Sequence, residues 1–171
     1  MIAHHGEAET EVWLRGVKNN LARKATGGDR DVARDILGGI CDMGLANSYY
    51  VGKMKSAKEG TDARNWGDAI KVVKPTFEKG GTHVNISGAA IARYAPHKEN
   101  AVKLMEYLVS APAQKIYAQA NYEYPVLKGV ALDPIISETI GEINVDTIPL
   151  VDIVKHRKQA SLLVDKVGFD Q

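Results

Sequence analysis

Apolar residues recur at helical spacing along most of the chain. Between residues 7 and 23 they lie three or four positions apart with charged residues between them, and Gly27 and Gly28 follow, a pattern typical of an amphipathic helix and its end. Asp29 then stands at the N-cap position of a second helix, where a carboxylate accepts from free backbone N–H groups. The spacing predicts helices over residues 7–23, 29–37, 49–58, 100–110, 112–120, 133–143 and 149–167.

Three shorter apolar runs have the length of strands. Residues 40–46 have the composition of a buried strand, 71–77 carry Pro75 and suit an edge, and 84–94 contain Gly88, which favours a bend. Helices that alternate with short apolar strands predict an α/β fold. Three strands are few for a parallel sheet with both faces covered, so we expect other parts of the fold to lie outside this chain.

Composition excludes several classes of protein. The 171 residues are 44% hydrophobic and 25% charged, as in an ordinary globular domain. Lys and Arg number 22 against 21 Asp and Glu, so a nucleic-acid-binding face or a polybasic membrane patch is not expected. The single cysteine excludes an intrachain disulfide and the Cys/His zinc frameworks. No run of about 18 apolar residues predicts a membrane span, and the first residues do not resemble a secretory leader. Taken literally this indicates the cytoplasm, an inference that fails for a piece of a longer precursor.

Several residues with catalytic or metal-binding chemistry have simpler interpretations. His4 and His5 with nearby glutamates suit zinc by ligand type, but we favour a solvated helix start. Cys41 is expected to be a buried, unreactive thiol in the first strand. Ser87-Gly88 lacks the full nucleophile elbow of hydrolases. No nucleophile and base pair is indicated, so we do not expect an enzyme.

The segment Asn47-Ser48-Tyr49-Tyr50 stands out because it follows a predicted buried strand and begins a helix. Binding sites of open α/β sheets concentrate at this position. Adjacent phenols on a helix point roughly 100° apart, which is compatible with two ligands on one ion. A phenol titrates near pH 10, so it needs a strong cation such as Fe(III) to ionise at neutral pH. From the tyrosines alone, packing or stacking on a sugar remains open beside metal binding.

Six segments together resemble the bacterial periplasmic ferric-ion-binding proteins, the substrate-binding components of iron(III) ABC transporters. The resemblance covers essentially the whole chain in order, and the combination is specific where any single piece is weak. The segments are Trp13–Arg23, Gly28–Arg30, Cys41–Tyr50, His83–Gly88, Lys98–Leu104 and Asn121–Val126.

The resemblance implies part of a type II periplasmic-binding-protein fold, whose two α/β lobes close on Fe(III). It assigns Tyr49 and Tyr50 as phenolate ligands, with Asn47 and Arg30 orienting them or holding a companion anion such as carbonate. The chain corresponds to the second half of such a protein. Residues 1–80 and 131–171 then belong to the C-terminal lobe, and 84–130 cross into an N-terminal lobe that the chain lacks.

The implied function is ferric-ion binding in the periplasm for an inner-membrane ABC permease. Tyr122 and Tyr124 are interpreted as packing residues, and a salt bridge at the helix start remains open for Arg30. The uncovered apolar face of 84–130 is expected to promote self-association. Alternatives are a protein of the same fold for another small anion or organic solute, an inactive structural remnant, and an α/β enzyme with an unrecognised site.

Overall fold

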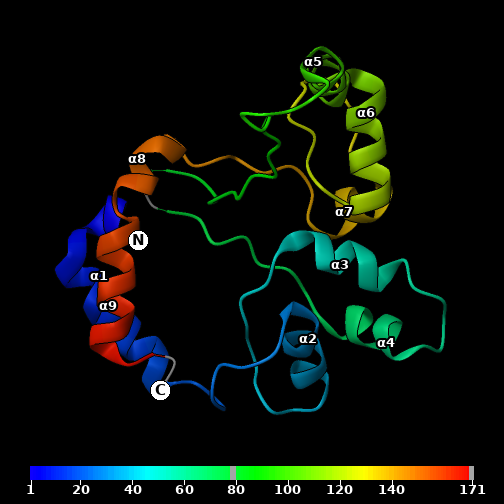
Figure 1. Cartoon of the computed structure of the whole chain (residues 1–171). Helices are drawn as coiled ribbons and strands as arrows, with labels where there is room; N and C mark the ends of the chain where they lie inside the picture. The colour runs from blue at the N-terminus through cyan, green and yellow to red at the C-terminus, as the bar shows by residue number, and fades with distance from the viewer. Residues whose placement is uncertain (78–79, 170–171) are drawn as a thin grey trace. The chain divides into compact units, whose positions relative to one another are not determined.

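The computed structural model describes residues 1–77 and 80–169, which form two compact units (Figure 1). Unit 1 comprises residues 1–28, 74–84 and 143–171. Unit 2 comprises residues 29–73 and 85–142. The elements of unit 1 are α1 (Ile2–Asn19), α8 (Leu150–Lys155) and α9 (Arg157–Val167). Those of unit 2 are α2 (Asp29–Leu37), α3 (Ser48–Lys55), α4 (Asp62–Ala69), α5 (Lys98–Leu108), α6 (Ala111–Ile116), the π-helix η1 (Tyr117–Asn121) and α7 (Pro134–Thr139).

In unit 1, α1 and α9 lie side by side although they come from opposite ends of the chain (Figure 1). Lys18 donates from Nζ to the carbonyl of Val167 at 3.0 Å, which satisfies an acceptor in the last turn of α9. The Lys166 ammonium donates to Glu11 Oε2 at 2.6 Å. Leu163 and Val167 are the buried side chains of α9.

A second contact in unit 1 joins the start of α1 to the segment before α8. His4 Nε2 lies 2.7 Å from Asp146 Oδ2, and the His4 ring stacks on Phe77 with centroids 4.0 Å apart. The side chains of His4 and Asp146 are only 13% and 4% exposed. Thr82 bridges to Val145 in parallel fashion, so the residues beside Asp146 are held by backbone hydrogen bonds as well.

Unit 2 is built around α3, which packs against α2, α4, α7 and η1. Val51 and Met54 are the buried side chains that α3 contributes. Gly67 of α4 lies so close to α3 that a Cβ there would stand 2.9 Å from the Cβ of Met54. The remaining buried apolar residues of this unit are Ala33, Ala113, Ala118 and Ile136.

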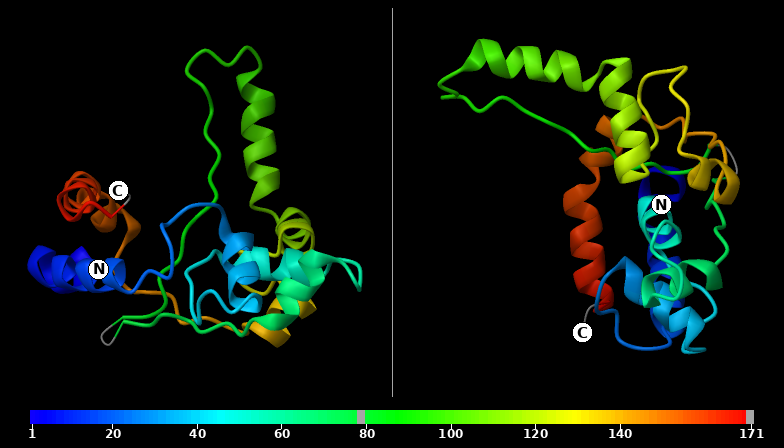
Figure 2. Two further views of the ribbon diagram at one scale, coloured as in Figure 1. Left: turned by 90° about the horizontal axis from the view of Figure 1, so that it is seen from below. Right: turned by 90° about the vertical axis from the view of Figure 1, so that its right-hand side faces the viewer.

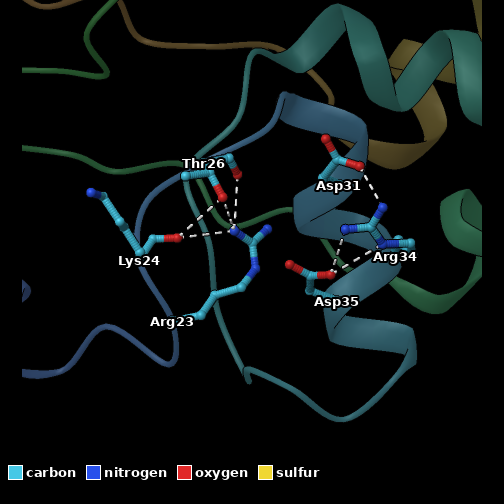
Figure 3. A network of polar contacts seen from close by, with 6 residues as sticks. All are labelled: Arg23, Lys24, Thr26, Asp31, Arg34 and Asp35. Carbon is cyan, nitrogen blue, oxygen red and sulfur yellow. Dashed lines mark hydrogen bonds and ion pairs between the residues drawn. The ribbon is translucent and has the colours of Figure 1, made fainter. Parts of the chain in front are cut away.

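Charged contacts hold α2 together (Figure 3). Arg34 donates from Nη1 to Asp31 Oδ1 at 2.7 Å and from Nη2 to the buried Asp35 at 3.0 Å. A buried carboxylate is costly unless it is paired in this way. In unit 1, Arg23 donates to the carbonyl and the hydroxyl of Thr26 and so closes the turn after α1 (Figure 3).

Helix α5 has no buried residue. Figure 2 shows it extending away from the cluster of α2, α3 and α4 in the same unit. Two of its apolar side chains are exposed, Val102 at 39% and Leu104 at 56%.

The predicted helices are present, but their bounds differ from the sequence pattern in informative ways. The first begins at Ile2 rather than at residue 7 and contains a non-helical Gly6 with φ of 75°. The predicted 149–167 helix divides into α8 and α9 at His156. Helix α4 was not predicted, because its polar sequence offers few apolar positions. Its N-cap Thr61 accepts from the backbone N–H of Arg64.

The prediction of three strands is wrong for the described residues. Residues 40–46 and 84–94 form no ladder, and the extended 71–77 segment contributes only an isolated antiparallel bridge between Thr76 and Thr82. A strand needs a neighbour to accept and donate its backbone hydrogen bonds. The expected burial of Cys41 is also wrong, since the thiol-bearing residue is half-exposed and Met43 beside it is 86% exposed.

No helix among the described residues is both long enough and apolar enough to cross a lipid bilayer.

Candidate functional site

The two adjacent tyrosines occupy the first turn of α3, as the sequence predicted for a helix start. Tyr49 and Tyr50 are half-buried, and their rings lie with centroids 4.5 Å apart at an interplanar angle of 37°. Side chains at neighbouring helical positions leave the helix about 100° apart, but these two rings still lie next to each other. Both phenol rings therefore belong to one small surface at the start of α3.

Asn47 begins α3 as its N-cap, with extended φ and ψ of −75° and 137°. Its side chain makes no capping bond to the helix. Instead, Asp29 Oδ1 accepts from the backbone N–H of Asn47 at 2.5 Å and from its side-chain Nδ2 at 3.1 Å. The start of the tyrosine helix is thus tied to the first residue of α2.

Two cations lie over the tyrosine rings. The Lys53 ammonium is 5.3 Å from the ring centroid of Tyr49 and 5.9 Å from that of Tyr50. The Arg30 guanidinium lies 5.7 Å from the centroid of Tyr50. Cations at this range are attracted to the ring faces, and they also favour negative charge on nearby oxygens. The structure therefore places Arg30 beside Tyr50.

The pKa of Tyr49 is raised above the usual value of a phenol. The chief cause is the hydrogen bond with the Tyr50 hydroxyl, followed by partial burial and by the negative charges of Asp29 and Glu123. The Tyr49 phenol consequently keeps its proton at neutral pH, and any metal that binds its oxygen must displace that proton.

The later tyrosines have packing contacts, in agreement with their interpretation from the sequence. Tyr122 adopts a left-handed conformation with φ of 62° and lies against Gly52 of α3. Tyr124 donates its hydroxyl proton to the carbonyl of Gly141 at 2.7 Å. Burial, together with the charge of Glu142, raises the pKa of Tyr124 to about 12.

The other candidate ligands do not gather into a site. Within residues 1–77 and 80–169, no group of three or more His, Cys, Asp and Glu side chains is placed to hold a metal ion. His4 is half-buried against Asp146, so the expectation of a solvated helix start is wrong for it. His5 is exposed and lies 3.6 Å from Glu9 on the same helix, which does fit a solvated start.

Sequence reasoning missed the contributions of Asp29, Lys53 and Glu123 to the tyrosine surface. Asp29 was interpreted only as a cap of α2, and its contact with Asn47 spans 18 positions in the chain. Lys53 lies one helical turn beyond the tyrosines, a spacing that predicts contact on a helix. Nothing in the sequence pattern indicates that Glu123 approaches Tyr49.

Comparison with known proteins supports one family. A family model described as bacterial extracellular solute-binding protein matches residues 13–141. Iron uptake protein A2 of Synechocystis sp. is 35% identical over 170 residues, which cover 98% of this chain and 49% of that protein. The chain therefore spans about half the length of the curated relatives it matches.

Solved structures of ferric-binding proteins share the fold. A Bordetella ferric binding protein is 72% identical with a TM-score of 0.91, over 100% of this chain and 54% of that one. A Trichodesmium protein solved in complex with iron and citrate is 37% identical with a TM-score of 0.90, over 98% of this chain and 52% of that one. The chain thus has part of a periplasmic-binding-protein fold, as the sequence predicted.

Proposed function

Because this chain belongs to the bacterial extracellular solute-binding proteins, we propose that it is part of a ferric-ion carrier and supplies two phenolate ligands, Tyr49 and Tyr50. Ferric iron is a hard cation that prefers anionic oxygen donors, and two phenolates provide them. Relatives described as iron uptake and ferric-binding proteins support this choice of cargo.

One observation carries the proposal, namely the meeting of two phenols in the first turn of α3. Their ring centroids are 4.5 Å apart, and the two hydroxyl groups are hydrogen-bonded to each other. Each phenol loses its proton on binding, so the site gains two negative charges only when the metal is present. A resting site of neutral phenols avoids holding two like charges together without a cation.

Asn47 and Arg30 are proposed to orient the phenols or to hold a companion anion, such as carbonate. The support is the guanidinium of Arg30 over the Tyr50 ring, with the Lys53 ammonium over both rings. The N-terminal end of α3 adds a favourable field for negative charge. Two positive side chains beside a trivalent ion favour iron that binds together with an anion.

The remaining parts of the proposal concern the whole carrier. Residues 1–80 and 131–171 are proposed to form its C-terminal lobe, with 84–130 crossing into the other lobe, and the iron lies in the cleft between lobes. The carrier delivers ferric iron in the periplasm to an inner-membrane ABC permease and catalyses no reaction. The exposed face of α5 is proposed to drive self-association of this chain.

Ferric titration monitored by visible absorbance tests the proposed ligands. Ferric citrate added to the whole carrier that contains this chain should produce a phenolate-to-iron charge-transfer band, whereas this chain alone should bind iron weakly. Tyr49→Phe and Tyr50→Phe keep the ring packing and remove one donor oxygen each, so each should weaken or shift the band, and the double variant should abolish it. Tyr107→Phe, on the exposed α5, is the matched control and should leave the band unchanged.

Two outcomes contradict the proposal. A whole carrier that develops no band with ferric citrate excludes phenolate ligation by these tyrosines. A double Phe variant that keeps the wild-type band assigns the colour to other groups and leaves the two tyrosines as packing residues. A different small anion or organic solute as cargo predicts the first of these outcomes, together with binding of that solute by calorimetry.

A further inference from the structure

The start of the tyrosine helix is held by an unusual arrangement of its N-cap. An asparagine at this position ordinarily accepts from a backbone N–H in the first turn of its own helix. Here the Asn47 side chain makes no such bond. Its Nδ2 group and its backbone N–H both donate to one oxygen, Oδ1 of Asp29, at 3.1 and 2.5 Å.

Asp29 is itself fixed, because it is the first residue of α2. That helix packs against both α3 and α4. Further along α2, Arg34 pairs with the buried Asp35 and with Asp31, which keeps the helix in one conformation (Figure 3). The backbone of Asp29 is therefore held by the packing of α2, and its carboxylate is placed to accept both hydrogen bonds from Asn47.

We propose that Asp29 is the positioning residue of the tyrosine pair: by accepting both hydrogen bonds from Asn47, it sets where α3 begins and hence where the two phenol oxygens point. This inference rests on the proposed iron ligation by Tyr49 and Tyr50. Asn47 precedes Tyr49 by two residues, so a change in its backbone is passed directly to the first turn. Hydrogen bonds to a charged acceptor are about twice as strong as neutral ones, which suits this role.

Two substitutions at residue 29 separate hydrogen bonding from charge. Asp29→Ala removes the acceptor, and Asp29→Asn keeps a side-chain oxygen that can accept from Asn47 while removing the charge. Asp62→Ala is the matched control, because Asp62 is likewise the first residue of a helix, α4, and is exposed. All three variants are compared by circular dichroism first, so that only folded chains enter the comparison.

The first measurement needs no iron. Amide hydrogen exchange of Asn47 and Tyr50, whose N–H groups donate to Asp29 and to the Asn47 carbonyl, should accelerate about tenfold in Asp29→Ala, since one charge-assisted hydrogen bond is lost. Asp29→Asn should recover most of the wild-type protection, and Asp62→Ala should exchange at the wild-type rate in this segment. Wild-type exchange at Asn47 and Tyr50 in folded Asp29→Ala overturns the inference.

The second measurement is the ferric charge-transfer band. In Asp29→Ala the band should shift in wavelength and the iron affinity should fall about tenfold, with Asp29→Asn restoring the wild-type position of the band. A general loss of stability lowers the affinity without moving the band. If the wild-type protein shows no band but amide exchange changes as expected, the proposed iron ligation is wrong. The proposed role of Asp29 in holding Asn47 is then retained. An unmoved band in Asp29→Ala overturns the inference while leaving iron ligation intact.

Discussion

The ring of Tyr122 lies directly against the backbone of Gly52 on α3, one turn beyond Tyr49. A Cβ added at Gly52 would overlap the Cβ and Cγ atoms of Tyr122. These atoms lie close to the main chain of Tyr122, which itself has a left-handed φ of 62°. Neither the α3 backbone at Gly52 nor the backbone of Tyr122 can move away easily. The lack of a side chain at residue 52 therefore allows the 121–125 segment to pack against α3.

Gly52→Ala should therefore destabilise the chain by about 1–3 kcal/mol, the usual cost of overpacking a tight contact. Gly16→Ala is the control, because nothing lies within 4 Å of a Cβ at that helical position. That control should stabilise by about 0.5–1 kcal/mol, as alanine does in place of glycine inside a helix. Urea unfolding measures both, and a Gly52→Ala variant as stable as Gly16→Ala contradicts the packing.

The sequence predicted every helix except α4, as well as the place of the tyrosine pair, because both depend on local patterns. Helix α2 ends where predicted, since two glycines follow Leu37, but Asp29 is its first residue rather than its N-cap. Residues 40–46 and 84–94 were predicted as strands from the same kind of pattern and form no ladder among the described residues. Strand formation depends on partners far along the chain or outside it, which a local pattern does not contain.

The surroundings of the tyrosines were harder to predict for the same reason. The contact between Asp29 and Asn47 joins residues 18 positions apart. Glu123 acts on Tyr49 from more than 70 positions further along, and only the packing of η1 on α3 brings that segment near. The His4 and Asp146 pair joins residues 142 positions apart, so His4 was interpreted as a solvated residue.

Alkaline stability should report the buried phenol of Tyr124. Its pKa is about 12 in the folded chain against 10.0 for an ordinary phenol, so the folded state retains the proton more strongly than the unfolded one. The contribution is complete below pH 10 and decreases as the pH rises from 10 to 12. Tyr124→Phe should lose part of this pH dependence. It should also lose about 1 kcal/mol at neutral pH, because the carbonyl of Gly141 loses its donor.

Urea unfolding at several pH values checks this prediction. Tyr94→Phe is the control, since Tyr94 is 85% exposed. It should follow the wild-type curve between pH 10 and 12. Equal alkaline slopes for wild type and Tyr124→Phe would assign the loss of stability to other groups.

Acid stability should report the contact between His4 and Asp146. The hydrogen bond from His4 holds the pKa of Asp146 below its usual 3.8, so the folded state prefers the ionised carboxylate. This contribution is present above pH 3.8 and is lost as the pH falls through the lower folded value. His4→Phe keeps a ring to stack on Phe77 and removes the hydrogen bond. The variant should be less stable at neutral pH and should lose less stability on acidification than the wild type.

Fluorescence-monitored unfolding at pH 7 and at pH 3 provides the comparison. His5→Phe is the neighbouring control, because His5 is exposed, lies 3.6 Å from Glu9 on the same helix, and has only a tilted contact with Phe77 at 6.0 Å between ring centroids. If His4→Phe and His5→Phe have the same acid sensitivity, the His4 contact does not stabilise unit 1.

The apolar surface of α5 should make this chain associate with itself. Val102 and Leu104 are 39% and 56% exposed on a helix that buries none of its residues. A second copy that covers these side chains removes their area from water, which is the main driving force of protein association. Sedimentation velocity should show a larger species as concentration rises, and Val102→Gln with Leu104→Gln should raise the dissociation constant about tenfold or more. The matched control is Leu45→Gln with Val73→Gln, at residues 76% and 85% exposed elsewhere in unit 2.

A wild-type chain that stays monomeric at all concentrations contradicts the prediction. Equal weakening by both pairs of substitutions would mean that association is a general effect of exposed apolar area, not a property of α5.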